Sequence, residues 1–310
     1  MARLPFCLLS VCRDVYSSSS MIRILFTIYA GLFGLVFGSF LNVCLSRWPR
    51  GMSVVKPRSY CESCGRTLAW WENVPLLSWL ALRGRCRTCR VWIGWRTVLV
   101  ELAVGGLWAA SAWDALGMMS WPNTPTSAVI LGDALTKMLF YWLLVALAAL
   151  DAEHLWLPNW LTLPGIAAGF LSTLILAPLD AIWWTDRATA KIAALDDLIS
   201  ILIAGGLVLL IRWIYRLIRR REGVGLGDAK LMAMLAAWLG FSGAMLSFGI
   251  GVVLGAVVAL VLLVIQKKRG QAEGWAMMKL PLGTFLCIGG IVSSLWGSRI
   301  IDTYLRWAGF

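Results

Sequence analysis

The sequence predicts an all-α, polytopic membrane protein with about eight transmembrane helices and a small four-cysteine insertion on the cytoplasmic side. Composition is the first observation behind this fold class. Of the 310 residues, 60% are hydrophobic and 14% are charged, at a mean hydropathy of +0.78. That is more apolar surface than a soluble core can bury. In addition, the apolar residues gather into long runs, and four cysteines gather in one polar loop.

The apolar runs are long enough to be membrane spans, because crossing a hydrocarbon core of ~30 Å takes about 20 apolar residues in a helix. The acidic stretch 180–197 between two of the runs is expected to be a solvated loop. The candidate spans are residues 22–46, 98–113, 134–150, 159–179, 198–218, 229–241, 243–265 and 280–300.

The sixth candidate span, 229–241, is too short for a full crossing, since a helix of that length reaches only ~20 Å. A turn with Gly223, Gly225 and Gly227 precedes it. We therefore expect this turn to enter the membrane, where irregular backbone is tolerated only if protein or a water-filled cavity covers it. Asp228, which follows the turn, is then expected to lie inside the membrane boundary.

The net charge of +12 is explained by topology. Eight spans place both termini on one side of the membrane. The connections 47–97, 212–230 and 266–280 hold twenty Lys and Arg residues, and the opposite side holds eight. The positive-inside rule puts these three connections in the cytoplasm. We therefore expect contact with membrane lipid and no binding of nucleic acid.

The organisation follows from these spans. Residues 1–21 are predicted to be an N-terminal extension, because their apolar stretch is too short to cross, and Met21 is an alternative start. The first transmembrane helix is predicted at 22–46, the cysteine-rich loop at 47–97, a membrane domain at 98–300 and a C-terminal tail at 301–310.

The loop "CESCGRTLAWWENVPLLSWLALRGRCRTC" contains two C-x-x-C pairs, Cys61 with Cys64 and Cys86 with Cys89. This is close to the spacing of a four-thiolate zinc site. Disulfides or a redox dithiol pair are the alternatives, and the cytoplasmic placement disfavours stable disulfides. A closed Cys₄ site has no open position, so the expected zinc is structural. The other cysteines, including Cys44 and Cys287, are expected to be small apolar fillers.

Two carboxylates are expected at similar depth on the cytoplasmic side. Asp151 ends the third span, and Pro158 follows seven residues later. Asp228 precedes the sixth span. Helix capping alone would explain either residue, but two acids at matched depth favour an intramembrane function. Two carboxyl groups that share a proton can hydrolyse a peptide, one activating water and the other polarising the carbonyl. Glu153 ranks second to Asp151, and His154, the only histidine, is expected to be a bystander.

These residues resemble the type IV prepilin peptidases, bacterial inner-membrane aspartyl proteases with a G-x-G-D motif. Gly225, Gly227 and Asp228 match that motif, Lys230 matches its D-x-K-L continuation, and the spacing from Asp151 to Pro158 matches the family's D-x6-P. The resemblance extends to "GSFLNV" at 38–43, "PRSYCESC" at 57–64, "NVPLLSWLALRGRCRTC" at 73–89 and "LVE" at 99–101. The family's P-F-G-P reads "PLGT" at 281–284, and its R-Y-P reads "RTV" at 96–98.

The resemblance implies a multi-pass inner-membrane enzyme whose active site lies near the cytoplasmic face. Asp151 and Asp228 would be catalytic, with Gly225, Gly227, Lys230 and Pro158 shaping the site. The substrates would be type IV prepilins or type II secretion pseudopilins, whose basic leader is cleaved. A second activity is implied for the cysteine loop: N-methylation of the new N-terminal residue with S-adenosylmethionine. The residues that bind this methyl donor are unknown, and Glu62, Glu72 and Glu153 are candidates for receiving the basic leader.

Two other classes of function remain open at this stage. Intramembrane carboxylates also serve proton-coupled transporters, although such carriers usually contain two related halves and this chain has no internal symmetry. The second class is a zinc-stabilised scaffold of a secretion apparatus, in which the carboxylates are structural.

Overall fold

The computed structural model describes the backbone of residues 7–118, 127–184, 187–220, 225–268 and 280–309. Within these ranges the chain is helical apart from its loops, and it contains no β-strand, as the sequence predicts. The helices and 3-10 turns are α1 (Cys7–Arg47), η1 (Trp48–Arg50), η2 (Trp70–Asn73), α2 (Leu77–Ala81), α3 (Trp95–Met118), α4 (Ser127–His154), α5 (Asn159–Trp184), α6 (Arg187–Arg219), α7 (Leu226–Lys268) and α8 (Leu282–Ala308).

Seven of the described helices are long and apolar enough to cross a membrane, which confirms a polytopic all-α membrane protein. Their ends differ from the predicted spans. The helix α6 begins at Arg187, so most of the stretch 180–197 is helical and the expected loop there is wrong. Similarly, α8 continues to Ala308, through most of the predicted tail. Charged residues are exposed at both helix ends, Lys191 and Asp196 in α6 and Asp302 and Arg306 in α8, and a helix tolerates such residues beyond its apolar centre.

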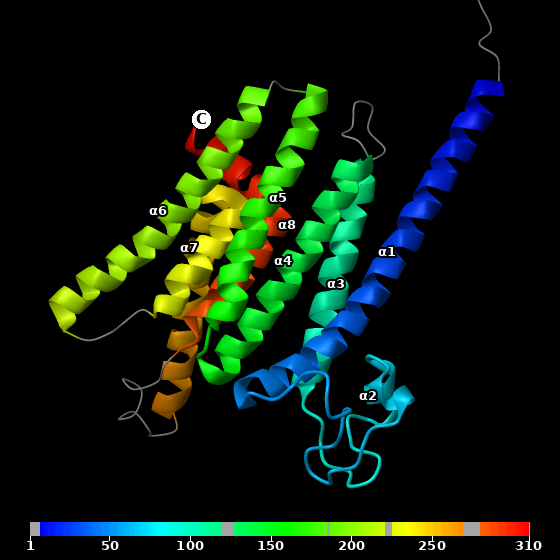
Figure 1. The fold of residues 1–310 in the computed structure, drawn as a ribbon, viewed down its shortest axis with the longest axis vertical. Helices are drawn as coiled ribbons and strands as arrows, with labels where there is room; N and C mark the ends of the chain where they lie inside the picture. Colours follow the sequence, from blue (N-terminus) through cyan, green and yellow to red (C-terminus); the bar gives the residue numbers. More distant parts are fainter. Residues whose placement is uncertain (1–6, 119–126, 185–186, 221–224, 269–279, 310) are drawn as a thin grey trace, which may run out of the picture. The chain divides into compact units, whose positions relative to one another are not determined.

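The helix α7 contains the predicted sixth and seventh spans, separated at Gly240. This glycine has φ 68° and ψ −179°, a non-helical conformation that divides α7 into a first arm (226–239) and a second arm (241–268). In the first arm residue numbers rise along α8, because Gly227 and Gly283 both lie against Leu157 and Leu235 lies against Gly290. In the second arm they fall, with contacts Gly243–Ser293, Ser247–Gly289 and Gly251–Leu286. The chain therefore reverses at Gly240, and the two arms are drawn in yellow and orange in Figure 1.

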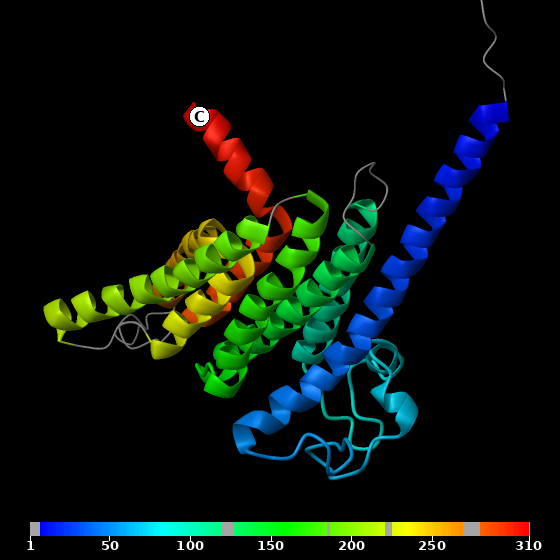
Figure 2. The same cartoon turned by 45° about the horizontal axis from the view of Figure 1, so that its top comes forward.

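The chain divides into two compact units, residues 1–141 and 142–310. In the first unit, α1 and α3 run side by side (Figures 1 and 2). They are antiparallel, because Gly31 lies against Ala109 and Gly38 against Glu101. A Cβ atom at Gly38 would lie 2.8 Å from the Glu101 Cα. Small residues of this kind allow two membrane helices to approach closely.

The second unit packs the end of α4 with α5, α6, α7 and α8. Glycines again form the contacts. Gly169 of α5 lies against Trp238 of α7, whose indole Nε1–H donates to the Gly165 carbonyl at 2.9 Å. Gly205 of α6 lies against Ala233. The first arm of α7 is thus held in the centre of this unit, and several of its side chains are fully buried: Leu231, Met232, Met234, Leu235 and Ala236.

Candidate active site

Asp151 lies in the last turn of α4, where the chain turns sharply into α5. Leu155 has a left-handed φ of 50°, and its N–H donates to the Asp151 carbonyl at 2.9 Å. Three residues later the Pro158 carbonyl accepts the N–H groups of Leu161 and Thr162, which begins α5. The seven-residue spacing from Asp151 to Pro158 is therefore the length of this helix–turn–helix connection.

The carboxyl group of Asp151 is held by the start of α8. Its Oδ2 accepts the backbone N–H of Thr284 at 2.7 Å, and the Thr284 hydroxyl lies 3.3 Å away. Thr284 is in the first turn of α8, where unpaired N–H groups attract an anion. The Asp151 side chain is buried, with 6% of the residue exposed. The helix N-terminus thus fixes the orientation of this carboxyl group.

The sequence predicts Asp228 just before the helix, but the residue lies in the first turn of α7. Its Oδ2 accepts the N–H of Gly225 at 3.0 Å. This is the backward hydrogen bond that an acidic residue makes at the third helical position. Helix capping is therefore part of the function of Asp228 in the fold. Gly223 lies outside the described residues.

Leu157, in the connection between α4 and α5, lies between the surroundings of the two acids. A Cβ atom at Gly227 would lie 3.0 Å from the Leu157 Cβ, and one at Gly283 would lie 3.0 Å from the Leu157 Cδ1 and 2.9 Å from the Asp151 Oδ2. Leu157 therefore fills the space between the residue next to Asp228 and the residue that contacts Asp151. Asp151 and the first turn of α7 thus approach the same leucine.

The other predicted site-shaping residues lie in the same place. Lys230 donates from its Nζ to the Asn159 Oδ1, which ties the first turn of α7 to the first turn of α5. Pro158 is buried beside it. Glu153 and His154 are exposed, and their charged atoms are 3.9 Å apart. They do not join the contacts around Leu157.

Three contributors to this site are not predicted by the sequence patterns: Leu157, Gly283 and Thr284. The last two belong to "PLGT", which differs from the P-F-G-P of the resembling family. The difference falls on the residue that holds Asp151, since a proline has no N–H to donate. The departure itself was the available signal.

The four cysteines form a cluster in the first unit. Each C-x-x-C pair lies in a tight turn closed by one isolated β-bridge, Tyr60–Thr67 for the first pair and Arg85–Trp92 for the second. The hydrogen bonds of the two turns also match. Cys61 N–H donates to the Arg66 carbonyl, and Cys86 N–H donates to the Val91 carbonyl, both at 2.9 Å. The loop is thus a pair of equivalent cysteine turns.

The sulfur positions suit a tetrahedral metal. All four sulfurs lie within 4.8 Å of one another, and Cys61 Sγ is 3.7 Å from Cys89 Sγ. Tetrahedral zinc with Zn–S bonds of ~2.3 Å requires sulfurs about 3.8 Å apart, whereas a disulfide requires about 2.05 Å. Backbone hydrogen bonds from Cys89 and Thr88 lower the pKa of Cys86 to about 6, while burial raises the pKa of Cys61 to about 11. Cys44 and Cys287 are buried, which confirms them as apolar fillers.

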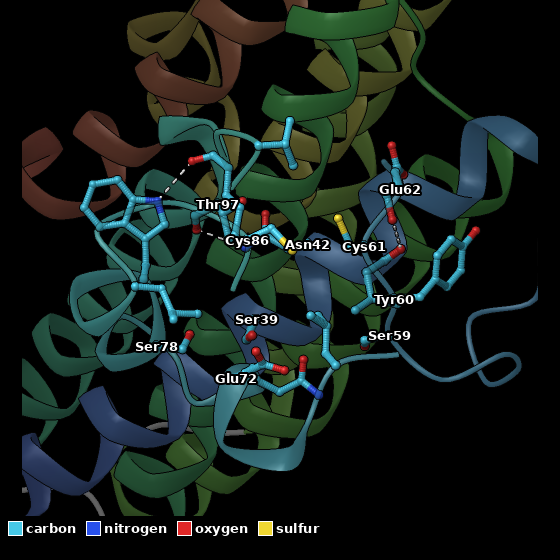
Figure 3. A pocket seen from close by; sticks show the side chains of 18 of the residues that line it. Ser39, Asn42, Ser59, Tyr60, Cys61, Glu62, Glu72, Ser78, Cys86 and Thr97 are labelled. Carbon is cyan, nitrogen blue, oxygen red and sulfur yellow. Dashed lines mark hydrogen bonds between the residues drawn. The ribbon is translucent and has the colours of Figure 1, made fainter. Parts of the chain in front are cut away.

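A cavity of about 450 Å³ lies in the same unit, between the end of α1, the cysteine loop and the start of α3. Figure 3 shows Ser39, Asn42 and Thr97 around it, with Cys61 and Cys86 beside them. Two of its acids are paired with arginines: Glu62 with Arg50 and Glu72 with Arg66. Hydrogen bonds from these arginines hold the pKa of each carboxyl group below its usual value.

The fold and the site define a helical membrane protein with acidic residues at the ends of two helices and a cysteine-rich loop. Comparisons with known proteins agree. Residues 32–115 match the bacterial peptidase A24 N-terminal domain, and residues 138–260 match the type IV leader peptidase family. No solved structure matches the chain.

Several curated relatives cover nearly the whole chain, and each is called prepilin leader peptidase/N-methyltransferase. The relative from Pseudomonas aeruginosa is 33% identical over 96% of this chain and 98% of its own length. The one from Burkholderia pseudomallei is 36% identical over 87% and 85%, and the one from Aeromonas hydrophila is 32% identical over 88% and 92%. The chain belongs to the type IV leader peptidase family.

Proposed function

We propose that this protein cleaves the basic leader from type IV prepilins or type II secretion pseudopilins and then methylates the new N-terminal residue. Family membership and the curated relatives' names support both activities. The observation that supports the peptidase assignment is that Leu157 lies against both Gly227, the neighbour of Asp228, and Gly283, which contacts Asp151. The transporter and scaffold readings are not favoured, because the relatives are enzymes along the full chain.

The peptidase step uses the two carboxyl groups as a general acid and a general base. The ionised carboxylate takes a proton from water, which attacks the scissile carbonyl carbon. The protonated partner donates to the carbonyl oxygen and later to the leaving amine. Thr284 and Gly225 contribute by fixing the two carboxyl groups. A well-aligned acid–base pair contributes about 10²–10⁴-fold to the rate.

Location is part of the proposal. The basic connections support an inner-membrane protein whose Asp151, Asp228 and cysteine loop lie at the cytoplasmic side. Prepilin leaders would meet the site there. Glu62 and Glu72 are weak candidates for receiving a basic leader, because arginines already neutralise them. Glu153 is exposed near Asp151 and is the better candidate.

Zinc is the metal we propose for the four cysteines, since their sulfur spacing and thiolate chemistry fit it. With all four positions taken by sulfur, the ion would stabilise the loop and take no part in hydrolysis.

The test is cleavage of a co-expressed prepilin, read by mass spectrometry of its N-terminus. Asp151→Asn and Asp228→Asn should each lower cleavage by about 10²–10⁴-fold. Asp302→Asn, an exposed carboxylate near the far end of α8 from Thr284, is the control and should stay within about 2-fold. If either aspartate variant processes prepilin normally, the catalytic assignment is wrong.

A further inference from the structure

The cavity in the first unit is bordered by a third carboxylate, Glu101 of α3, which differs from the other two. Only 4% of Glu101 is exposed. Its Oε2 accepts the N–H of Leu76 at 2.9 Å, and the side chains of Ser39 and Asn42 also donate to it. Within the described ranges of the chain, no lysine or arginine forms an ion pair with it. All its hydrogen-bond donors are neutral. Three arginines, Arg47, Arg87 and Arg96, also line the cavity.

A buried hydrogen-bond acceptor without a donor among the described residues lies next to this carboxylate. Asn42 is 9% exposed, and its Nδ2 donates to the Thr97 carbonyl at 2.9 Å and to Glu101. These two acceptors fix the orientation of the amide. The Asn42 Oδ1 is buried and has no donor among the described residues. A buried carboxylate and a buried amide oxygen, side by side, call for a ligand that is cationic and carries N–H groups.

The cavity is also large enough for a cofactor and has aromatic walls. Its volume of about 450 Å³ lies within the range of small-molecule sites. Trp79 and Trp92 border it with ring centroids 5.7 Å apart. Aromatic faces attract cations as well as planar rings. A ligand with a heteroaromatic ring and a positive centre therefore fits these walls, and S-adenosylmethionine has both.

We propose that this cavity is the methyl-transfer site, which binds S-adenosylmethionine and the new N-terminal ammonium of the substrate, with Glu101 as the group that receives the ammonium and its proton. The inference rests on the proposed methyltransferase activity. The Glu101 carboxylate takes one proton from the ammonium, and the lone pair of the resulting amine forms the new N–C bond. S-adenosylmethionine, when bound, supplies the methyl group as its C–S bond breaks and the electron pair stays on sulfur.

Binding is tested first, on the purified full-length protein in detergent, by equilibrium dialysis with labelled S-adenosylmethionine. Ser78→Phe should weaken binding at least 10-fold, because Ser78 borders the cavity and the ring would fill it. Leu80→Phe is the matched control on the same short helix, α2. Leu80 is 64% exposed and does not border the cavity, so binding should be unchanged. Equal binding by Ser78→Phe and the wild type would place the donor elsewhere and overturn the proposal.

The role of Glu101 is tested on a co-expressed prepilin, by measuring leader loss and methyl addition in the same spectrum. Glu101→Gln should bind S-adenosylmethionine within about 3-fold of wild type, cleave normally and retain metal, yet lose about 100-fold in methylation. Asp114→Asn, an exposed change on the same helix, is the control and should methylate normally. Normal methylation by Glu101→Gln, with its metal retained, would overturn the role of Glu101.

A loss of metal or of donor binding in Glu101→Gln would show that the carboxylate supports the fold of the loop, and would also overturn the role given to it. The proposed function fails in a different way. If wild-type protein cleaves the prepilin and adds no methyl group, the methyltransferase activity is absent whatever the cavity variants do.

Discussion

Thr284 holds Asp151 through two groups, its backbone N–H at 2.7 Å and its hydroxyl oxygen at 3.3 Å from the same Oδ2. The hydroxyl also lies 3.0 Å from the Ala148 carbonyl. When the hydroxyl donates to Ala148, its oxygen can accept the proton of a protonated Asp151. Thr284 can therefore support both protonation states that an acid–base carboxyl group passes through.

Removing the hydroxyl of Thr284 should lower cleavage without removing the backbone hydrogen bond. We expect Thr284→Val to cleave a co-expressed prepilin about 10- to 150-fold more slowly, since one hydrogen bond to a charged group is worth about 1.5–3 kcal/mol. Thr284→Ser keeps the hydroxyl and should stay within about 2-fold. Equal rates for Thr284→Val and Thr284→Ser would show that the backbone N–H alone positions Asp151.

Adding a methyl group at Gly283 should displace Asp151. A Cβ there would lie 2.9 Å from the Asp151 Oδ2, and misplacing a catalytic group by about 1 Å can cost about 10²-fold. We expect Gly283→Ala to reduce cleavage by about that factor. Gly227→Ala should have a smaller effect, because its Cβ meets only Leu157, at 3.0 Å.

The control for both glycines is Gly249→Ala in the second arm of α7, where an added Cβ has nothing within 4 Å. This variant should cleave normally and be slightly more stable, because alanine favours a helix over glycine by about 1 kcal/mol. Reduced cleavage by Gly249→Ala would mean that helix flexibility and not the space at Asp151 sets the rate.

The positions of Asp151 and Asp228 at helix ends could be predicted from the sequence, because each residue adjoins an apolar span. Leu157 and Thr284 could not. Leu157 is one apolar residue among many, and its position between Gly227 and Gly283 depends on how three separate segments pack. Thr284 reaches Asp151 from 133 positions away in the sequence, and no local pattern encodes that contact.

The length of the sixth span alone shows that it is too short to cross a membrane. In the structure this span is the first arm of α7, and the non-helical Gly240 separates it from the second arm. The sequence did not reveal that α6 begins at Arg187, because Asp196 and Asp197 are typical of a loop. Its apolar residues Ile192, Leu195 and Ile199 recur at helical spacing and are exposed, which is the pattern that a membrane-facing helix end shows.

Glu72 should stabilise the cysteine loop through its charge. It accepts hydrogen bonds from Arg66 and from the Ala69 N–H, both at 2.7 Å, and its side chain is 1% exposed. Glu72→Gln should lower the stability of the loop by about 1.5–3 kcal/mol. Faster release of metal to a chelator would measure this loss. Glu62→Gln is the control, because the Arg50 pair is exposed and should contribute at most about 1 kcal/mol.

The same carboxylate gives the loop a pH dependence with a definite sign. The hydrogen bond from Arg66 lowers the pKa of Glu72 in the folded protein. Its stabilisation is therefore complete above the usual glutamate pKa and is lost as the pH falls through the lowered one. Metal release should accelerate below about pH 4 in the wild type, and Glu72→Gln should remove this part of the acceleration. An unchanged pH profile would contradict the assignment.

Removing the metal should separate the two activities. The cysteine turns and the cavity belong to the first unit, whereas Asp151 and Asp228 belong to the second. Zinc bound by four thiolates stabilises a small loop by about 10–16 kcal/mol, and Cys61 and Cys86 border the cavity. We therefore expect Cys64→Ser to lose zinc and methylation while cleavage stays within about 3-fold. Cys44→Ser, a buried thiol outside the cluster, should keep the metal. Metal content by mass spectrometry, measured with cleavage and methyl addition, decides the matter: full methylation by a metal-free Cys64→Ser protein would show that the loop folds without zinc.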